Sequence, residues 1–204
     1  LLTSSVFAEQ TQIANYNKGR DVFWTKVYPA GGWTAYCGFK FENRSKTTDD
    51  RPLSVEHVVP AKWMVDKLGC ENRNQCRDTN TTFNHFEGDL HNMYPALRNV
   101  NSSRADTPFG IIEGETWRYE YCDYERTPDK AEPREIIRGN FARSVFYVME
   151  EYSLTIPAEQ LTLLKKWNKD DPVSCHEMHR NNRIEIQQGT RNRFIDHPDK
   201  ADAL

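Results

Sequence analysis

The chain has 204 residues, of which 37% are hydrophobic, 28% charged and 12% aromatic, and its formal net charge is −3. This share of apolar and aromatic residues excludes wholesale disorder, and because no apolar run reaches 18 residues, we expect no membrane-spanning helix. A mean hydropathy of −0.83 and a pI of about 6.1 exclude a globally basic surface. A polyanionic ligand would therefore need a local basic cleft.

The first eight residues resemble the end of an export signal. Val6 and Ala8 occupy the −3 and −1 positions of a signal-peptidase site, although an ordinary frayed terminus is the alternative. We therefore expect residues 1–8 to be a signal-peptide remnant and residues 9–204 to form one domain in a periplasmic or secreted protein.

The cysteine content fits an exported protein. Five cysteines predict two disulfides and one free thiol, because oxidising compartments favour disulfide formation. Cys70 and Cys76 flank the turn-like residues 71–75, so we predict that they form one pair. The second pair, among Cys37, Cys122 and Cys175, stays open.

Apolar spacing predicts the elements of the first half of the chain. A helix is expected over residues 9–28, with Ile13, Tyr16, Phe23 and Val27 on one face. Alternation over residues 33–41 predicts a strand that buries the odd-numbered side chains. Two further strands are expected at residues 53–60 and 88–95, with a helix beginning near Ala61 between them, and a helix is expected to follow the second strand.

The second half of the chain is expected to be mostly helical. A strand is predicted at residues 116–121, and apolar residues repeat at helical spacing over residues 134–152. Pro157 opens another helix, and the last one begins at a capping box of Ser174 and Glu177 and ends at Gly189. Together the elements predict an α+β fold.

The two central strands and the segment after them carry the chemistry-bearing residues. Glu56 and His57 end the first strand, His91 and Asn92 lie in the second, and Asn101 follows. A neutral histidine can deprotonate water near neutral pH, while carboxylate and amide oxygens suit a hard cation such as Mg²⁺. This order of strand, strand and helix predicts a one-metal site that cleaves phosphodiesters.

The strand geometry leaves one question open at this site. Neighbouring side chains of a regular strand point to opposite faces, so Glu56 and His57 do not both face one metal from a straight strand. Either the strand twists or bulges there, or Glu56 approaches the metal from the far side.

Three motifs together resemble the bacterial endonuclease I family. They are Val55-Glu56-His57-Val58-Val59-Pro60-Ala61, Asp89-Leu90-His91-Asn92, and Val100-Asn101 with Arg104 three residues later. The resemblance extends from the first helix to the region of Gly189. It implies an exported nuclease without sequence preference, built on a ββα-metal (His-Me finger) core with several packing helices.

The resemblance also implies roles for single residues. His57 matches the general base, Glu56 and Asn101 match the ligands of one Mg²⁺ ion, and Arg73 matches the arginine that holds the cleaved phosphate. Glu87 matches a supporting acid near the site. Family members cut DNA, and often RNA, leaving 5′-phosphate ends. Mn²⁺ and Ca²⁺ remain alternatives to Mg²⁺, and we expect a monomer.

Several polar residues have less specific interpretations. We expect His91 and Asn92 to organise loops through hydrogen bonds, with Asn92 tying the loop of Arg73 to the second strand. Arg104 either reaches substrate phosphate or pairs with Glu87 or Asp89. The arginines at 134, 138 and 143 fit a solvated helix face better than a DNA groove. His176 and His179 lack a second ligand pair, so zinc is not expected there.

Two rival functions use the same residues. The first is a secreted nucleic-acid-binding domain without turnover, which the presence of a competent residue at each catalytic position disfavours. The second is an RNA-preferring phosphodiesterase with the same site.

Overall fold

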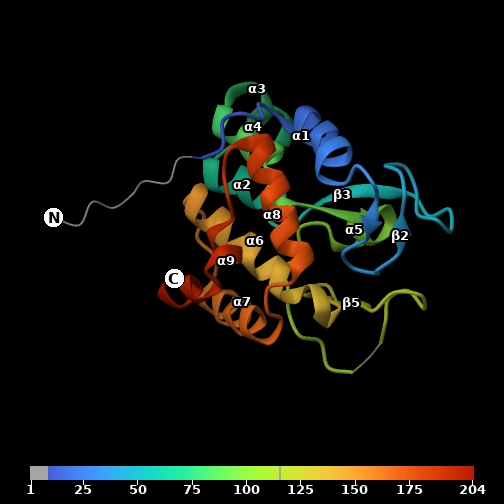
Figure 1. Cartoon of the computed structure of the whole chain (residues 1–204). Helices are drawn as coiled ribbons and strands as arrows, with labels where there is room; N and C mark the ends of the chain where they lie inside the picture. The colour runs from blue at the N-terminus through green and yellow to red at the C-terminus, as the bar shows by residue number, and fades with distance from the viewer. Residues whose placement is uncertain (1–8, 115) are drawn as a thin grey trace.

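The computed structural model describes residues 9–114 and 116–204. The predicted signal remnant at residues 1–8 lies outside them. Helices surround small antiparallel strand pairs, as the expected α+β class requires (Figure 1). No helix in the described ranges is long and apolar enough to cross a membrane.

The central strand pair is antiparallel, and the first two motifs meet at the end where His57 pairs with Met93. Strand β3 (Leu53–His57) pairs with β4 (Met93–Leu97), with Glu56 opposite Tyr94 and His57 opposite Met93. The second strand is shorter than predicted and begins later. Residues 88–92 instead form the end of a helix and a 3₁₀ turn, η2 (Leu90–Asn92), because the Asp89 side chain caps that turn at the His91 amide.

Helices fill the segment between the two strands. Helix α2 (Ala61–Leu68) begins where expected and ends at Gly69, which adopts a left-handed conformation. Two helices that the sequence analysis missed follow: α3 (Arg73–Thr79) and α4 (Thr81–Gly88). The sequence signals for these helices were the N-cap residues Asn72 and Asn80. Their side-chain oxygens accept hydrogen bonds from backbone amides in the first turn of each helix. After β4, the chain turns directly into α5 (Arg98–Arg104).

The N-terminal segment departs from the prediction in two places. Helix α1 (Tyr16–Val22) begins at the Asn15 cap and continues as a π-helical turn, η1 (Phe23–Val27), so residues 9–15 are not helical. The predicted strand at 33–41 is a turn between two short strands, β1 (Gly32–Trp33) and β2 (Lys40–Phe41). Because the chain turns, the expected alternation fails: Trp33 is 57% exposed and Tyr36 is fully buried.

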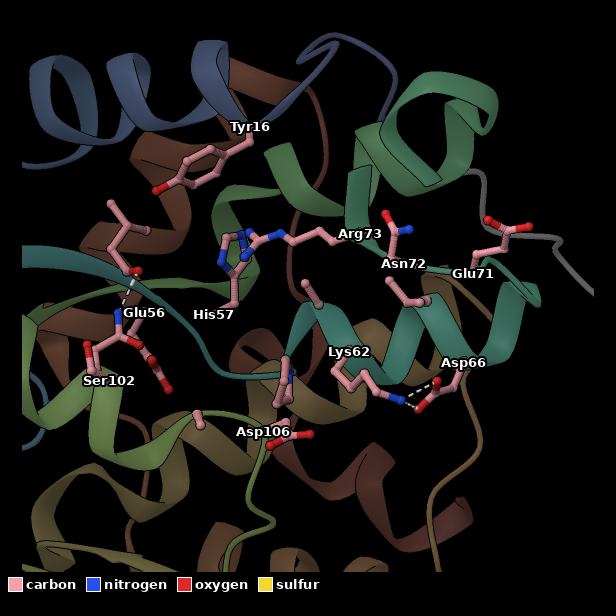
Figure 2. Close-up of a pocket in the computed structure, with 16 residues that line it drawn as sticks. Tyr16, Glu56, His57, Lys62, Asp66, Glu71, Asn72, Arg73, Ser102 and Asp106 are labelled. Atoms are coloured by element: carbon pink, nitrogen blue, oxygen red, sulfur yellow. Dashed lines mark hydrogen bonds and ion pairs between the residues drawn. The ribbon is translucent and has the colours of Figure 1, made fainter. Parts of the chain in front are cut away.

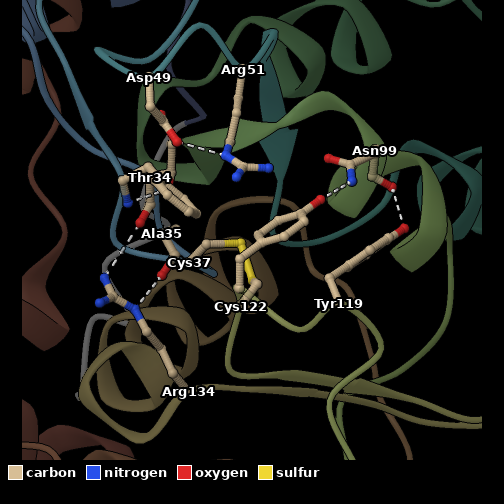
Figure 3. Close-up of a disulfide and its surroundings, with 11 residues drawn as sticks. Thr34, Ala35, Cys37, Asp49, Arg51, Asn99, Tyr119, Cys122 and Arg134 are labelled. Carbon is tan, nitrogen blue, oxygen red and sulfur yellow. Dashed lines mark hydrogen bonds and ion pairs between the residues drawn. A yellow bond between two sulfur atoms is a disulfide. The ribbon is translucent and has the colours of Figure 1, made fainter.

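The strand predicted at residues 116–121 is not present, and a disulfide anchors this part of the chain instead. The chain there forms bends and turns, and the strand pair β5 (Tyr124–Arg126) and β6 (Ala131–Pro133) follows. Cys37 bonds to Cys122, beside which the Tyr121 hydroxyl accepts a hydrogen bond from Asn99 Nδ2 (Figure 3). The disulfide thus fixes this loop against the start of α5.

The other disulfide prediction is confirmed. Cys70 and Cys76 are bonded, which links the end of α2 to α3. Cys175 is the free thiol, and it is exposed.

Helices make up the C-terminal part of the chain. They are η3 (Glu135–Ile137), α6 (Arg138–Glu151), α7 (Ala158–Asp170), α8 (Cys175–Gln188), α9 (Arg193–Asp196) and η4 (Pro198–Ala203). Helix α6 packs on α7 and α9, and α8 lies across the same layer (Figure 1). The predicted boundaries at Pro157, Ser174 and Gly189 are confirmed.

One arginine of α6 contradicts the expectation of a solvated face. Arg143 is fully buried, and its guanidinium forms two hydrogen bonds to the Glu177 carboxylate, at 2.8 and 2.6 Å. Glu177 therefore completes only half of the predicted capping box: its amide is capped by Ser174, but its carboxylate turns inward. A buried, bidentate ion pair joins α6 to α8, and neither residue faces a DNA groove.

Candidate functional site

The motif residues converge on one open pocket. It has a volume of about 740 Å³ and is walled by α1, β3, α2, the start of α3, and α5. Glu56, His57, Arg73 and Asn101 all line it, although they come from three separate elements. In Figure 2, Arg73 reaches from α3 toward the His57 ring, and Tyr16 approaches from α1.

His57 stands at the end of β3 with one ring nitrogen fixed. Its Nε2 lies 2.9 Å from the carbonyl oxygen of Glu87. Because a carbonyl only accepts, Nε2 carries the proton and Nδ1 keeps its lone pair. Burial lowers the pKa of His57 to about 4, so the ring is neutral at pH 7. A neutral imidazole with a free lone pair on the pocket side can accept a proton from water.

Glu56 precedes His57 in the same strand. The register from Leu53 to His57 is uninterrupted, so β3 has no bulge there, and Glu56 and His57 both line the pocket from neighbouring positions of the strand. The Glu56 carboxylate accepts hydrogen bonds from Tyr36, at 2.7 Å, and from Arg104, at 3.3 Å, both at Oε1. Burial raises the pKa of Glu56, while Arg104 and Tyr36 act to lower it.

Asn101 is oriented by β3. Its amide nitrogen donates to the Val55 carbonyl, at 2.8 Å, and to the Ser54 hydroxyl, at 3.0 Å. Both bonds use Nδ2, so within the described residues Oδ1 accepts no hydrogen bond. The amide is therefore held with its nitrogen toward the strand and its oxygen free for another ligand.

Arg73 is positioned by a buried acid. Glu87, fully buried in α4, accepts hydrogen bonds from Nε of both Arg73 and Arg77, the latter at 2.5 Å. The Arg73 side chain is 46% exposed and lines the pocket, while its Nε is anchored to Glu87. Arg73 is the first residue of a helix rather than a loop residue, which fixes its backbone as well.

Comparison with known proteins decides the family. The family model for Endonuclease I matches residues 7–199. This chain belongs to the endonuclease I family. The resemblance inferred from the three motifs is thereby confirmed.

Three relatives are about 30% identical to the chain over the aligned residues. A periplasmic deoxyribonuclease of Aeromonas hydrophila is 32% identical over 194 residues, which cover 84% of this chain and 81% of that protein. An extracellular deoxyribonuclease of the same organism is 32% identical over 169 residues, covering 79% and 73%. An extracellular ribonuclease of Bacillus amyloliquefaciens is 29% identical over 198 residues, covering 79% and 66%.

Arg104 does not take either role expected of it in this endonuclease I chain. The side chain is fully buried and pairs with Glu56, not with Glu87 or Asp89. Its guanidinium also donates to the carbonyls of His57, at 3.0 Å, and Val58, at 2.8 Å. Because it has no exposed surface, Arg104 holds the end of β3 in place and does not contact substrate.

His91 and Asn92 lie behind the pocket and are fully buried. The Asn92 side chain accepts from the Val59 amide, at 2.8 Å, and donates to the Val59 carbonyl, at 3.0 Å. It therefore ties η2 to the segment just after His57, not to the segment of Arg73. The His91 ring bonds to the Thr190 carbonyl, at 3.0 Å, and does not line the pocket.

Sequence reasoning missed three residues of this site. Tyr36 was placed on an exposed strand face, yet its hydroxyl holds Glu56. Arg77 shares Glu87 with Arg73, and its spacing of four residues along α3 was the available signal. Tyr16 was predicted only as a helix-face residue, but its ring centroid lies 5.5 Å from that of His57.

The pocket residues fit a hard divalent cation. In the described ranges, no three His, Cys, Asp or Glu side chains gather as a metal site. Glu56 Oε2 and Asn101 Oδ1, however, accept no hydrogen bond from any described residue, and each is fixed through its other polar atom. One carboxylate and one amide oxygen suit Mg²⁺, which keeps several waters and binds substrate phosphates.

Proposed function

We propose that this protein is an exported, divalent-metal-dependent endonuclease that hydrolyses DNA, with RNA as a further candidate substrate, to 5′-phosphate ends. The observation that carries the proposal is the shared pocket of His57, Arg73, Glu56 and Asn101, at the junction of two antiparallel strands and a helix. In this proposal β3, β4 and α5 form the ββα-metal core.

His57 accepts the proton of the attacking water at Nδ1. The Glu87 carbonyl holds Nε2–H, which fixes the tautomer that leaves Nδ1 basic. The resulting hydroxide attacks phosphorus in line, and the bond between phosphorus and the 3′-oxygen breaks. The 5′-phosphate stays on the other fragment, and the 3′-oxygen takes a proton from solvent.

Arg73 holds the phosphate that is being cleaved. Its Nε is bound to Glu87, so the guanidinium presents its remaining N–H groups in one orientation. A planar guanidinium can bond two phosphate oxygens at once, which positions phosphorus as well as attracting it. Glu87 and Arg77 act as positioning residues for Arg73.

Glu56 and Asn101 would hold one hard cation, with Mg²⁺ proposed and Mn²⁺ or Ca²⁺ as alternatives. When bound, such a cation neutralises charge that grows on the phosphate and on the leaving oxygen. Tyr36 and Arg104 fix the Glu56 carboxylate, and Ser54 and the Val55 carbonyl fix the Asn101 amide. The ligands are thus oriented before a cation arrives.

Export is supported by the two disulfides and by the names of the relatives. Disulfides persist in oxidising compartments, and both deoxyribonuclease relatives are called extracellular or periplasmic. The ribonuclease name of the Bacillus relative is the reason to test RNA. Lack of sequence preference is expected because contacts to phosphate and sugar carry no base information.

A plasmid-nicking assay tests the proposal. We expect supercoiled plasmid to be relaxed and degraded with Mg²⁺ and to stay intact with EDTA. Intact plasmid in both reactions, with retained DNA binding, would identify the non-catalytic rival. Parallel digestion of duplex DNA, single-stranded DNA and RNA of equal length tests the RNA-preferring alternative. That alternative predicts that RNA is degraded at least about tenfold faster than either form of DNA.

A further inference from the structure

A second hollow adjoins the pocket and is lined by arginines. It has a volume of about 480 Å³ and shares Tyr16 and Val55 with the first pocket. Arg20, Arg44 and Arg98 line it, and all three side chains are exposed. We refer to it below as the arginine hollow.

The elements that carry the site residues also lead into the arginine hollow. On α1, Arg20 follows Tyr16 by four residues, so both lie on one face of the helix. On α5, Arg98 precedes Asn101 by three residues, again one turn away. Strand β3 runs from Val55 back to Leu53 beneath them. A chain bound at His57 therefore meets Arg20 and Arg98 about one helical turn from the site.

Charge distinguishes the arginine hollow from the opposite mouth of the pocket. In the hollow, three arginines accompany one aspartate, Asp21, which contacts Arg44 at 3.9 Å with both side chains more than half exposed. Beyond His57, the pocket is lined by Asp66, Glu71 and Asp106, with Lys62 bound to Asp66. The charges of the two linings therefore favour phosphate in the arginine hollow over the opposite mouth.

We propose that the arginine hollow binds the backbone phosphates of the nucleic-acid strand next to the bond that is cleaved. The protein has a net charge of −3, so it offers no global field to concentrate a polyanion. Three exposed guanidiniums beside the pocket supply that attraction locally. The identity of the ligand rests on the proposed nuclease function. The new element of this proposal is the place where the nucleic-acid strand binds.

The test removes two arginines and measures binding without cleavage. The double variant R20Q/R98Q is compared with K166Q/K200Q, which changes the net charge equally on exposed residues of α7 and η4, away from α1 in Figure 1. Fluorescence anisotropy with a labelled single-stranded DNA 20-mer and an RNA of the same sequence is measured in EDTA at several salt concentrations. Thermal melting of both variants checks their folding.

We expect R20Q/R98Q to raise the Kd about fivefold or more at 0.1 M salt for both polymers. The slope of log K against log salt should become shallower by about 1.4, because roughly 0.7 is lost for each single-strand phosphate contact. K166Q/K200Q should leave both values near wild type. Equal slopes in the two variants, a loss confined to one polymer, or no binding by the wild type would each overturn the proposal.

The nicking assay separates this inference from the proposed function. If R20Q/R98Q weakens nucleic-acid binding but the wild type does not cut with Mg²⁺, the proposed nuclease function is rejected and the proposed binding surface is retained. Cutting by the wild type, combined with an unchanged salt slope in R20Q/R98Q, would keep the nuclease and reject the arginine hollow. In the nuclease, R20Q/R98Q should raise KM by a factor similar to the rise in Kd and leave kcat near wild type.

Discussion

Two histidines of this protein have nearly the same polar surroundings but different access to solvent. His57 bonds through Nε2 to the Glu87 carbonyl, and His91 bonds through Nε2 to the Thr190 carbonyl. Burial lowers the pKa of His57 to about 4 and that of His91 to about 3. Only His57 lines the 740 Å³ pocket, whereas His91 is fully buried against Tyr147.

The comparison shows that a perturbed pKa alone does not mark a reacting group. Both rings are neutral at pH 7 with one tautomer fixed, so both satisfy the protonation requirement of a general base. The difference is that His57 lines an open pocket, while Nδ1 of His91 is enclosed without a partner in the described structure. Access, not basicity, separates the catalytic candidate from the structural residue.

The largest expected effect comes from removing the accessible ring. His57→Ala should lower kcat by roughly 10²–10⁴-fold, because the proposed base is lost while Arg73 and the arginine hollow remain. DNA binding in EDTA should stay within about twofold of wild type. Plasmid cleavage kinetics and anisotropy measure the two quantities.

The matched control for that variant is His91→Gln. It removes the buried ring but leaves the pocket lining unchanged, so kcat should stay within about tenfold of wild type at temperatures where the variant is folded. Near-normal cutting by His57→Ala would remove the assigned base. Equal kcat losses in both variants would mean that folding, not access, explains the defect.

Each of the two disulfides lies next to a helix that lines the pocket. Cys37–Cys122 closes a separation of 85 residues beside α5, and Cys70–Cys76 closes a separation of six beside Arg73. Chain entropy gives about 5 kcal/mol for the long loop and about 2 kcal/mol for the short one. Urea unfolding of C37S/C122S and C70S/C76S should show that order of destabilisation, and equal losses would contradict the entropic explanation.

Removing the Asn101 side chain should have a smaller effect, which is specific to the metal dependence of the activity. Asn101→Ala removes the free Oδ1, so the Mg²⁺ concentration for half-maximal activity should rise by at least about 10–100-fold. Asn101→Asp keeps an oxygen but cannot donate to the Val55 carbonyl, so its Mg²⁺ titration should fall between those of wild type and Asn101→Ala. An unchanged Mg²⁺ titration in Asn101→Ala would place the ligand elsewhere.

Local sequence signals predicted the parts of the fold that depend on neighbouring residues. The helices at residues 134–152 and after Pro157, the start of α2 at Ala61, and the Cys70–Cys76 pair all follow from periodicity, breakers or short spacing. The same signals failed at residues 33–41. There, alternation fitted a strand, but the chain turns because tertiary contacts bury Tyr36 against Glu56.

The partners of the buried charged residues could not be predicted from the sequence. The motifs indicated Glu56, His57 and Asn101, and the structure places these side chains at one pocket. Arg104 and Arg143 appeared to be surface or substrate residues, yet both are buried and paired with Glu56 and Glu177. Their partners lie 48 and 34 residues away, and no local spacing encodes such a contact.

The buried histidine should be visible as a pH dependence of stability. Its pKa in the folded protein is about 3, below the ordinary value of 6.5, because burial disfavours the charged ring and Arg180 and Arg191 add to this, against Asp196. The unfolded chain therefore binds a proton first as pH falls below about 6.5, and folded-state stability is lost from there toward pH 3.

For this one histidine, the free energy of unfolding changes by at most about 1.4 kcal/mol per pH unit. Urea unfolding of wild type and His91→Gln between pH 7 and 4 isolates it, because the raised pKa of Asp89 acts in the opposite direction in both proteins. We expect the stability difference between the two proteins to shrink as pH falls. A constant difference would mean that His91 has the same pKa in the folded and the unfolded protein, and that enclosure does not distinguish it from His57.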